Sequence, residues 1–263
     1  MWAKKITYYQ VATPGIRQPS TVNRQPQNGI FAQSSMQSPF PHKILNQQFW
    51  LTGDRTLYWE EEKALIVSDL HFGKTGHFRK SGIAVPQSLY KEDLQRLVVQ
   101  IQYFQPKRLI IVGDMFHSHA NKELELFLRW RDDLEGLEIQ LIRGNHDILN
   151  EDWYEQAGIR LNQTTLSLNR FHFIHDISDL ENRAQAFVKN TSHSSSYFFS
   201  GHLHPGIRIQ GLGKQSLCFP CFYFGKEYAV LPAFSRFTGV ALIAPEKEEN
   251  VFAIVNDAVM RLQ

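Results

Sequence analysis

The stretch ALIVSD, residues 64–69, is a short and continuous apolar run that ends in a polar turn. A run of this length with β-branched residues predicts a strand that is buried on both faces. Two runs of the same kind follow, RLIIVGD at 108–114 and EIQLIRGNHD at 138–147. The segments between them, 86–104 and 121–136, have the apolar spacing of amphipathic helices. Strand, helix, strand, helix, strand predicts a parallel sheet of the α/β class.

Downstream of residue 160 the pattern is dominated by strands. The apolar runs are TLSLN, FHFIHD, YFFSGHLHP, GIRIQG, SLCFP, EYAVLP and VFAIVN, with one helical stretch at 182–188. Many strands joined by short Gly or Pro turns predict a second sheet packed against the first. We therefore expect an α/β protein built as a four-layer α-β-β-α sandwich of two mixed sheets with outer helices.

Length and composition indicate one sizeable globular domain. The chain has 263 residues, of which 43% are hydrophobic and 21% charged. No apolar stretch approaches the length of a membrane span, and no apolar segment of a secretory signal follows Met1. We expect a cytoplasmic protein with no membrane partner. Its two cysteines, Cys218 and Cys221, are too few for a disulfide framework and are interpreted as free thiols.

The N-terminal segment differs from the rest. Residues 1–53 hold five basic residues and no acid, and because the whole chain carries +2, the remainder carries −3. Residues 1–44 are rich in Gln, Ser, Pro and Asn without apolar periodicity, which predicts a disordered basic tail before a domain at 45–263. A dispensable extension is the favoured interpretation of this tail. A transit peptide and a basic arm that contacts nucleic acid are the alternatives.

Polar residues with metal-ligand character follow one apolar run after another. They are Asp69 and His71, Asp114, Asn145 and His146, His175, and His202 and His204. The ends of strands in an open α/β sheet converge on one crevice, so we expect these side chains to meet there.

A nucleotide-binding loop is the competing interpretation of the first of these turns. Gly73, Lys74 and Thr75 match the end of a P-loop. The pattern also needs a glycine five residues before Gly73, where the chain has Ser68. We therefore discard the P-loop.

The mixture of carboxylate, amide and imidazole groups suits borderline or hard divalent ions. We expect two such ions, with Mn²⁺ as the first expectation and Fe²⁺ or Zn²⁺ as alternatives. Asp114, central in sequence order, can bridge them. Two ions clamp both oxygens of an in-line displacement at phosphorus, and a water shared between them supplies hydroxide at neutral pH.

The blocks SDLH, VGDMFHS, RGNHD, IHD and GHLHP resemble, in order, the calcineurin-like metallophosphoesterase superfamily. The resemblance implies one metal held by Asp69, His71 and His204. It implies a second held by Asn145, His175 and His202, with Asp114 bridging. His146 would then protonate the leaving oxygen.

Further motifs narrow the resemblance. His117 in GDMFH is similar to a substrate-orienting histidine of the nuclease branch, and implies the same catalytic role here. SDLHFGKTGHFRKSGIAVP, GHLHPG, FPCFYFG and LPAFSRFTG resemble the DNA ligase-associated metallophosphoesterases (PdeM), often encoded beside a ligase, a helicase and an exonuclease. Ser235 and Arg236 depart from that group's pattern, where we expect smaller residues. The residues expected to contact substrate are His77, Arg79, Lys80 and Arg143, with Lys74 as a further candidate.

The leading hypothesis is a two-metal phosphodiesterase that acts on nucleic acid, as a DNA-repair-associated endonuclease attacking in line with a metal-bridging hydroxide. Its possible partners are DNA and the ligase, helicase and exonuclease of a repair system. One alternative is a phosphodiesterase of small molecules such as 2′,3′-cyclic nucleotides. Another is a non-catalytic scaffold with the same fold.

Overall fold

The computed structural model describes residues 7–8, 37–72, 88–116, 121–178, 196–211 and 215–263. Several sequence predictions lie outside these residues: the helical stretch at 182–188, Lys74, His77, Arg79, Lys80 and His117. No helix in the described ranges combines the length and the apolar character that crossing a membrane requires.

The strands of the described residues form two sheets. A seven-stranded sheet has the order β2 (Phe40–Ile44), β3 (Gln47–Leu51), β4 (Leu57–Trp59), β5 (Ala64–Ser68), β6 (Arg108–Val112), β7 (Glu138–Ile142) and β8 (Ile159–Asn162). Strands β5 to β8 are parallel, and β2 to β4 join them as antiparallel neighbours.

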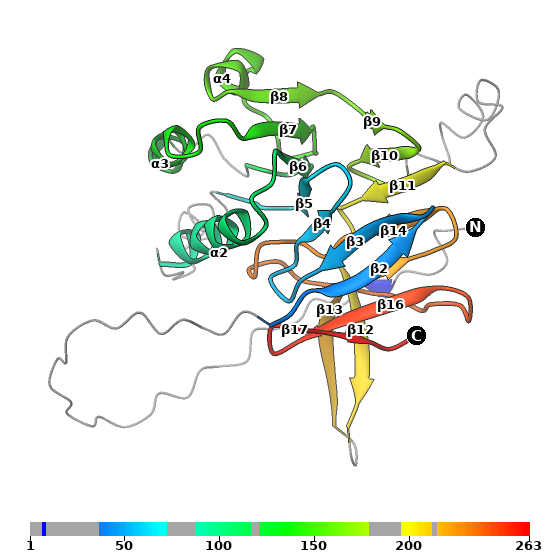
Figure 1. Ribbon diagram of the computed structural model, residues 1–263. Coiled ribbons are helices and arrows are strands. Elements are labelled where there is room, and N and C mark those ends of the chain that lie inside the picture. The colour runs from blue at the N-terminus through cyan, green and yellow to red at the C-terminus, as the bar shows by residue number, and fades with distance from the viewer. Residues whose placement is uncertain (1–6, 9–36, 73–87, 117–120, 179–195, 212–214) are drawn as a thin grey trace, which may run out of the picture.

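The second sheet has ten strands. Its order is β1 (Thr7–Tyr8), β15 (Ala241–Leu242), β12 (Pro205–Gln210), β13 (Ser216–Phe224), β14 (Tyr228–Val230), β11 (Tyr197–Ser200), β10 (Phe171–Ile174) and β9 (Leu166–Leu168). Strand β16 (Asn250–Val255) pairs with β13 and with β17 (Ala258–Arg261). The two sheets lie against each other, and β12 and β13 extend away from them as a long ribbon (Figure 1).

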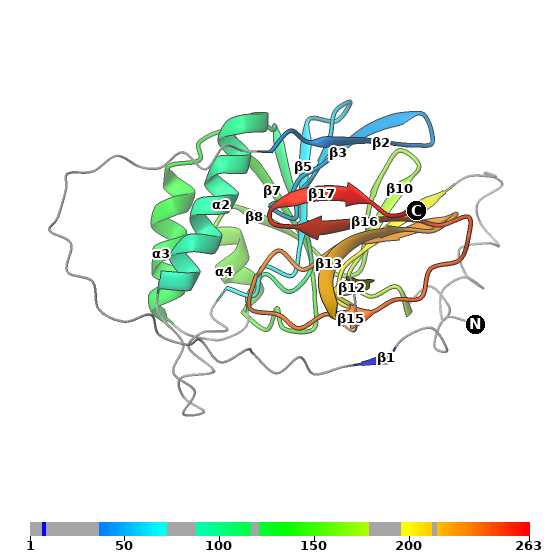
Figure 2. The ribbon, with the colours of Figure 1, turned by 90° about the horizontal axis from the view of Figure 1, so that it is seen from below.

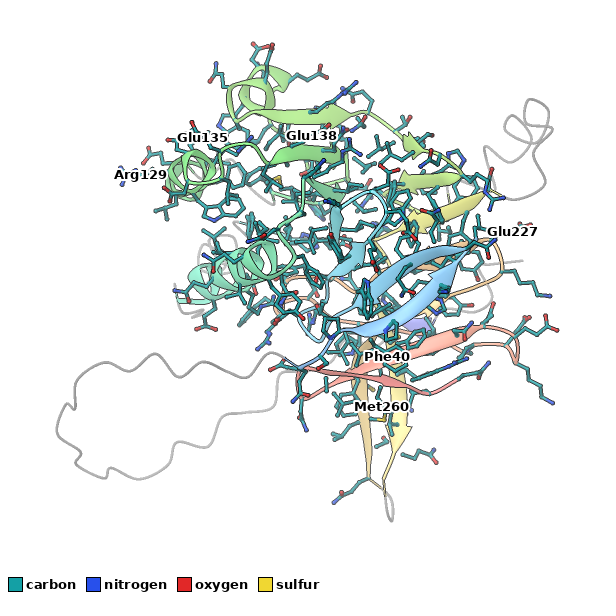
Figure 3. The ribbon with its side chains drawn as sticks, viewed as in Figure 1. Phe40, Arg129, Glu135, Glu138, Glu227 and Met260 are labelled. Atoms are coloured by element: carbon teal, nitrogen blue, oxygen red, sulfur yellow. The ribbon has the colours of Figure 1, made fainter. Side chains whose placement is uncertain are left out.

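The helices of the described residues, α2 (Ser88–Phe104), α3 (Asn121–Asp132) and α4 (Glu151–Gln156), cover the seven-stranded sheet. They gather on the side that faces away from the second sheet (Figure 2). Side chains on the outer side of α3 and beyond its end, such as Arg129 and Glu135, point into solvent (Figure 3). The predicted α/β sandwich of two mixed sheets is thus the observed fold, and the described helices form the outer layer on the seven-stranded sheet.

The central strands are apolar throughout because each of their faces meets a different core. In β5, Leu65 and Val67 pack toward the helices, whereas Ala64 and Ile66 pack toward the second sheet. All five residues of β5 are buried. The core between the sheets combines aliphatic and aromatic residues, and the rings of Phe173 and Phe199 are stacked at 5.3 Å between their centroids. The continuous apolar run at residues 64–68 therefore belongs to a strand covered on both sides.

Strand β2 and helix α3 have other bounds than the sequence pattern indicated. Strand β2 begins at Phe40, ahead of the expected boundary between residues 44 and 45, pairs with β3, and places Ile44 between the sheets. The tail prediction missed this strand because its Pro41 and His42 break the apolar pattern. The helix expected at 121–136 ends at Asp132, and the chain turns before Gly136, which has a positive φ of 81°.

Candidate metal centre

The turns after β5 and β6 lie side by side at one end of the seven-stranded sheet. The amide N of Asp69 donates to the carbonyl of Gly113 at 3.2 Å, and the amide N of His71 donates to the carbonyl of Asp114 at 2.9 Å. Several candidate ligands have a left-handed backbone conformation. In the turns after β5 and β6 the φ values are 51° at Asp69, 47° at His71 and 50° at Asp114. In the turn between β11 and β12 they are 64° at His202 and 49° at His204. Each such conformation costs on the order of 1–3 kcal/mol and persists only where the surroundings enforce it, which is typical of functional sites.

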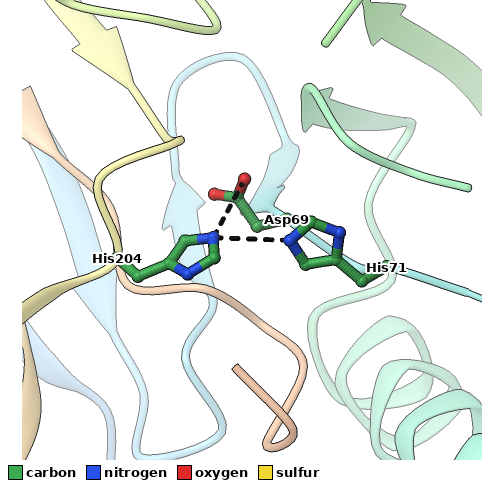
Figure 4. Close-up of side chains that lie close together, drawn as sticks. All are labelled: Asp69, His71 and His204. Atoms are coloured by element: carbon green, nitrogen blue, oxygen red, sulfur yellow. Dashed lines mark hydrogen bonds and ion pairs between the residues drawn. The ribbon is translucent and has the colours of Figure 1, made fainter. Parts of the chain in front are cut away.

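The first group of candidate ligands comprises Asp69, His71 and His204. Their ligand atoms all lie within 4.8 Å of one another. Nε2 of His204 is 3.4 Å from Oδ1 of Asp69 and 3.4 Å from Nε2 of His71 (Figure 4). Asp69 and His71 are buried and His204 is partly exposed. Two imidazoles and a carboxylate, from the turn after β5 and the turn before β12, thus lie close enough together to bind one ion.

The second group comprises Asp114, His175 and His202, again within 4.8 Å of one another. Nε2 of His175 is 3.4 Å from Oδ1 of Asp114 and 3.2 Å from Nδ1 of His202. The other ring nitrogen of His175, Nδ1, faces the carbonyl oxygen of Val112 at 3.3 Å. A proton on Nδ1 can be donated to that carbonyl, which leaves the lone pair of Nε2 directed into the group.

Asp114 lies between the two groups. Its Oδ1 faces His175, while its Oδ2 is 3.9 Å from Nε2 of His71 in the first group. Oδ1 also accepts a hydrogen bond of 2.8 Å from the amide N of His146, which holds the carboxylate against the turn after β7. A carboxylate with one oxygen toward each group has the geometry of a bridging ligand.

Three glycines allow the turns to approach this closely. Gly113, Gly144 and Gly201 each directly precede a predicted ligand. A Cβ at Gly113 would lie 1.9 Å from Nδ1 of His175, and one at Gly144 would lie 2.3 Å from Oδ1 of Asp114. A Cβ at Gly201 would lie 2.5 Å from Oδ2 of Asp69. Contacts this short do not occur between real side chains. The ligands therefore pack directly against backbone, and any larger residue would displace them.

The charge state of the first group suits a cation. Burial alone would raise the pKa of Asp69, but the hydrogen bond with His204 and the charges of His204, His175 and His71 outweigh it and lower the pKa to about 2. Asp69 is therefore an anion at neutral pH. Carboxylates mixed with imidazoles fit a borderline or hard divalent ion.

Asn145 and His146 lie in the turn after β7, and both are exposed. The side chain of His146 is 47% exposed, and its Nε2 is 3.9 Å from Oδ2 of Asp114. Its ring centroid is 5.6 Å from that of His71. His146 thus stands at the open edge of the centre, where a substrate can reach it.

Sequence reasoning assigned no role to Asp147, which fastens two of the turns together. Its Oδ1 accepts hydrogen bonds from the amides of Met115 (2.9 Å) and Phe116 (3.1 Å), and its Oδ2 accepts one from Gly144 (2.8 Å). Burial raises its pKa to about 7, against the lowering effect of these hydrogen bonds. In the sequence, the position of this carboxylate directly after the motif RGNH is the feature that could have indicated a role for it.

Asp176 is a second residue without a predicted role. Its Oδ2 lies 3.7 Å from Nε2 of His202, on the side of the ring opposite the nitrogen that faces His175. Carboxylates commonly orient metal-ligating histidines in this way. The block IHD contained this residue, but nothing in the sequence indicated that it would face His202.

Arg143, expected to contact substrate, pairs with side chains outside the two ligand groups. Its Nη1 donates to Oε1 of Gln163 at 2.8 Å and lies 3.5 Å from Oε1 of Glu151. The other residues expected to contact substrate, and His117, lie outside the described ranges.

Comparison with known families adds an independent finding. The family model described as the calcineurin-like phosphoesterase superfamily domain matches residues 63–212, which hold both ligand groups. No curated protein matches the chain.

One of the matching solved structures, a nuclease, shows the same fold. The nuclease MPE of Pseudomonas putida is 27% identical, with a TM-score of 0.68, and the match covers 84% of this chain and all of that one. Two more distant matches are the phosphoesterase Yfce of E. coli and a predicted phosphoesterase of Streptococcus pneumoniae TIGR4. The first is 11% identical with a TM-score of 0.37, over 75% of this chain and 96% of that one. The second is 12% identical with a TM-score of 0.34, over 76% and 95%.

Proposed function

Because the chain belongs to the calcineurin-like phosphoesterase superfamily and is therefore a metal-dependent phosphoester hydrolase, we propose that it hydrolyses phosphodiester bonds in nucleic acid. The observation that carries the proposal is the carboxylate of Asp114, which has one oxygen directed at each of two ligand groups. Two divalent ions held there would polarise the phosphate and activate water for attack in line with the leaving oxygen. We propose Mn²⁺ as the preferred ion.

The residues of the chain divide the remaining work. Asp69, His71 and His204 would hold one ion, and Asn145, His175 and His202 the other, with Asp114 shared. His146 is exposed beside the centre and can donate a proton to the leaving oxygen. Positioned acid catalysis of this kind is typically worth about 10² to 10⁴ in rate.

A nucleic-acid substrate is supported by the similarity to the Pseudomonas putida nuclease. The charge of residues 54–263 is −3, so long-range attraction to a polyanion is weak without metal, and two divalent ions would bring +4. Contacts to the phosphate backbone need only local cations. His77, Arg79 and Lys80 are the proposed contacts. The resemblance of the C-terminal motifs supports a place in DNA repair beside a ligase, a helicase and an exonuclease.

The test is a substrate panel with Mn²⁺, Fe²⁺ or Zn²⁺ added separately. Single-stranded DNA circles, plasmid DNA, RNA and 2′,3′-cyclic nucleotides are incubated with the wild-type protein and with Asp114→Asn. We expect circular single-stranded DNA to be opened by the wild type alone, which would identify endonuclease activity. Cleavage confined to cyclic nucleotides would replace the proposal with a small-molecule phosphodiesterase. Cleavage of nothing in the panel, by a chain that binds no metal, would favour a scaffold.

A further inference from the structure

The segment Leu231–Arg236, which we call the C-terminal loop, lies along the end of β5. Ala233 forms a parallel bridge with Ser68. The amide N of Phe234 donates to the carbonyl of Ser68 at 2.8 Å, and that of Ser235 donates to the carbonyl of Asp69 at 3.3 Å. The C-terminal loop therefore binds the backbone on which Asp69 is presented.

Two arginines hold the C-terminal loop in place. Nη1 of Arg55 donates to the carbonyls of Ala233 (3.0 Å) and Ser235 (2.8 Å), and Nη2 of Arg96 donates to the carbonyl of Phe234 at 2.6 Å. Three successive carbonyls are thus fixed by guanidinium groups, whose planar and rigid arrangement of donors suits such a task.

The arginine on α2 is itself held firmly. Arg96 pairs with Asp93 at 2.7 Å, donates to the carbonyl of Asp54 at 3.1 Å, and lies over the ring of Phe234 at 4.2 Å. Phe234 is fully buried. The contacts run from α2 and the turn before β4, through the C-terminal loop, to Asp69.

The target of these contacts is a strained residue. Asp69 has a φ of 51°, and its backbone is pinned on one side by Gly113 and on the other by Ser235. Without Ser235 its carbonyl would lose its partner, and the residue could relax toward an extended conformation that turns the carboxylate away from His204. By contrast, the turns that carry Asp114 and Asn145 are fastened by Asp147, and within the described residues the backbone carbonyls that accept hydrogen bonds from the two arginines belong to the C-terminal loop and to Asp54.

We propose that Arg55 and Arg96 are positioning residues, which act through the C-terminal loop to hold Asp69 in the first ligand group. The inference rests on the proposed function in that it assumes the group binds a metal ion. It predicts a selective effect: weakening the arginine contacts should impair the first metal site and leave the second intact.

The experiment uses Arg55→Met and Arg96→Met, which keep most of the side-chain volume and remove the donors. Arg108→Met is the matched control, because Arg108 is also partly buried and pairs with Glu138 at 2.8 Å, at the opposite end of the parallel strands. Mn²⁺ binding is followed by titration calorimetry and by electron paramagnetic resonance. We expect each loop variant to lose about 10-fold or more in affinity at one of two sites, as is usual when a metal ligand loses its support. The control should bind like the wild type.

Combining Arg96→Met with a variant of one ligand group identifies the affected site. In the His175→Asn protein only the first ligand group is complete, so adding Arg96→Met should lower its Mn²⁺ affinity by the same factor as in the wild type. In the Asp69→Asn protein only the second ligand group is complete, so adding Arg96→Met should leave its Mn²⁺ affinity unchanged. Arg96→Lys retains a charge and a single strong donor, and should restore part of the affinity, which also covers the case in which Arg96→Met does not fold.

Either of two results would overturn the inference: both Mn²⁺ affinities unchanged in the loop variants while their metal-free thermal stability falls, or equal weakening of both sites. Failure of the proposed function is distinguishable, because a wild-type protein that binds two ions but cleaves no nucleic acid still allows the selective loss to be measured.

Discussion

Asp114 has a different neighbour for each of its carboxylate oxygens, and His146 approaches it from the solvent side. We therefore predict separable roles for the two residues, one in holding ions and one in transferring a proton.

This separation leads to a prediction on two variants. Asp114→Asn removes a charge and an acceptor oxygen shared by both groups, so Mn²⁺ binding should weaken at both sites and turnover should fall below detection. His146→Asn leaves both groups complete, so binding should persist while kcat falls by about 10² to 10⁴. Metal titrations and steady-state kinetics on the same preparations provide the measurement. Equal losses of metal in the two variants would contradict the assigned roles.

Gly201 gives a second prediction at this scale. A methyl group there would lie 2.5 Å from Oδ2 of Asp69, whereas one at Gly239 meets nothing within 4 Å. Neither glycine has a positive φ, so the comparison isolates the steric effect. Gly201→Ala should lower the Mn²⁺ affinity and cost about 1–3 kcal/mol of stability, the usual range for overpacking. Gly239→Ala should change neither quantity, as measured by metal titration and denaturant unfolding.

Among the elements, β2 forms an edge of the seven-stranded sheet and contacts the second sheet through the ring of His42. This contact depends on whether His42 is protonated. The ring of His42 lies 4.4 Å from that of Phe224 and 5.1 Å from that of Phe252, between centroids. Burial, with a smaller effect of Arg261, lowers the pKa of His42 from 6.5 to about 4. The neutral imidazole is therefore the form that packs between the sheets.

The pH dependence of stability follows from this shift. Between pH 6.5 and 4 the unfolded chain binds a proton at His42 that the folded chain does not, so the free energy of unfolding should fall as the pH is lowered through this window. Because the side chain is partly exposed, we expect a loss on the order of 1 kcal/mol, well below the full value of the shift. Urea unfolding at pH 7 and pH 4.5 should show a smaller loss for His42→Phe than for the wild type. Identical losses would remove His42 as the cause.

The sequence predicted the elements whose burial pattern is simple and missed those whose pattern is mixed. Strands β5, β6 and β7 were found because both their faces are apolar. Strand β2 was not, because its residues alternate between exposed and partly buried and include Pro41. The residues with ligand character were visible because they follow strands. The roles of Asp147, Arg55 and Arg96 were not, since each depends on a contact to a backbone group that no local pattern encodes.

Over the whole molecule, each ligand group draws on both sheets. Asp69, His71 and Asp114 follow strands of the seven-stranded sheet, whereas His175, His202 and His204 follow β10 and β11 of the other. A bound ion would therefore link the sheets directly, in addition to the aromatic core between them.

Metal should accordingly stabilise the folded protein as a unit. At a free Mn²⁺ concentration about 100 times the dissociation constant, each site should add roughly 2.7 kcal/mol, because the unfolded chain has no such site. The melting temperature should rise with Mn²⁺ concentration and fall on addition of a chelator. His175→Asn should show a reduced rise, and Asp69→Asn combined with His175→Asn should show none. A melting temperature independent of Mn²⁺ in the wild type would argue against both sites.

The order of the ligands along the chain has one more consequence. A cut in the short connection between β8 and β9 would leave Asp69, His71 and Asp114 on one fragment and the candidate ligands His175, His202 and His204 on the other. Neither fragment could assemble a complete cation site by itself, and only their reassociation would restore one. A complete ion site therefore requires the two halves of the chain to be docked against each other.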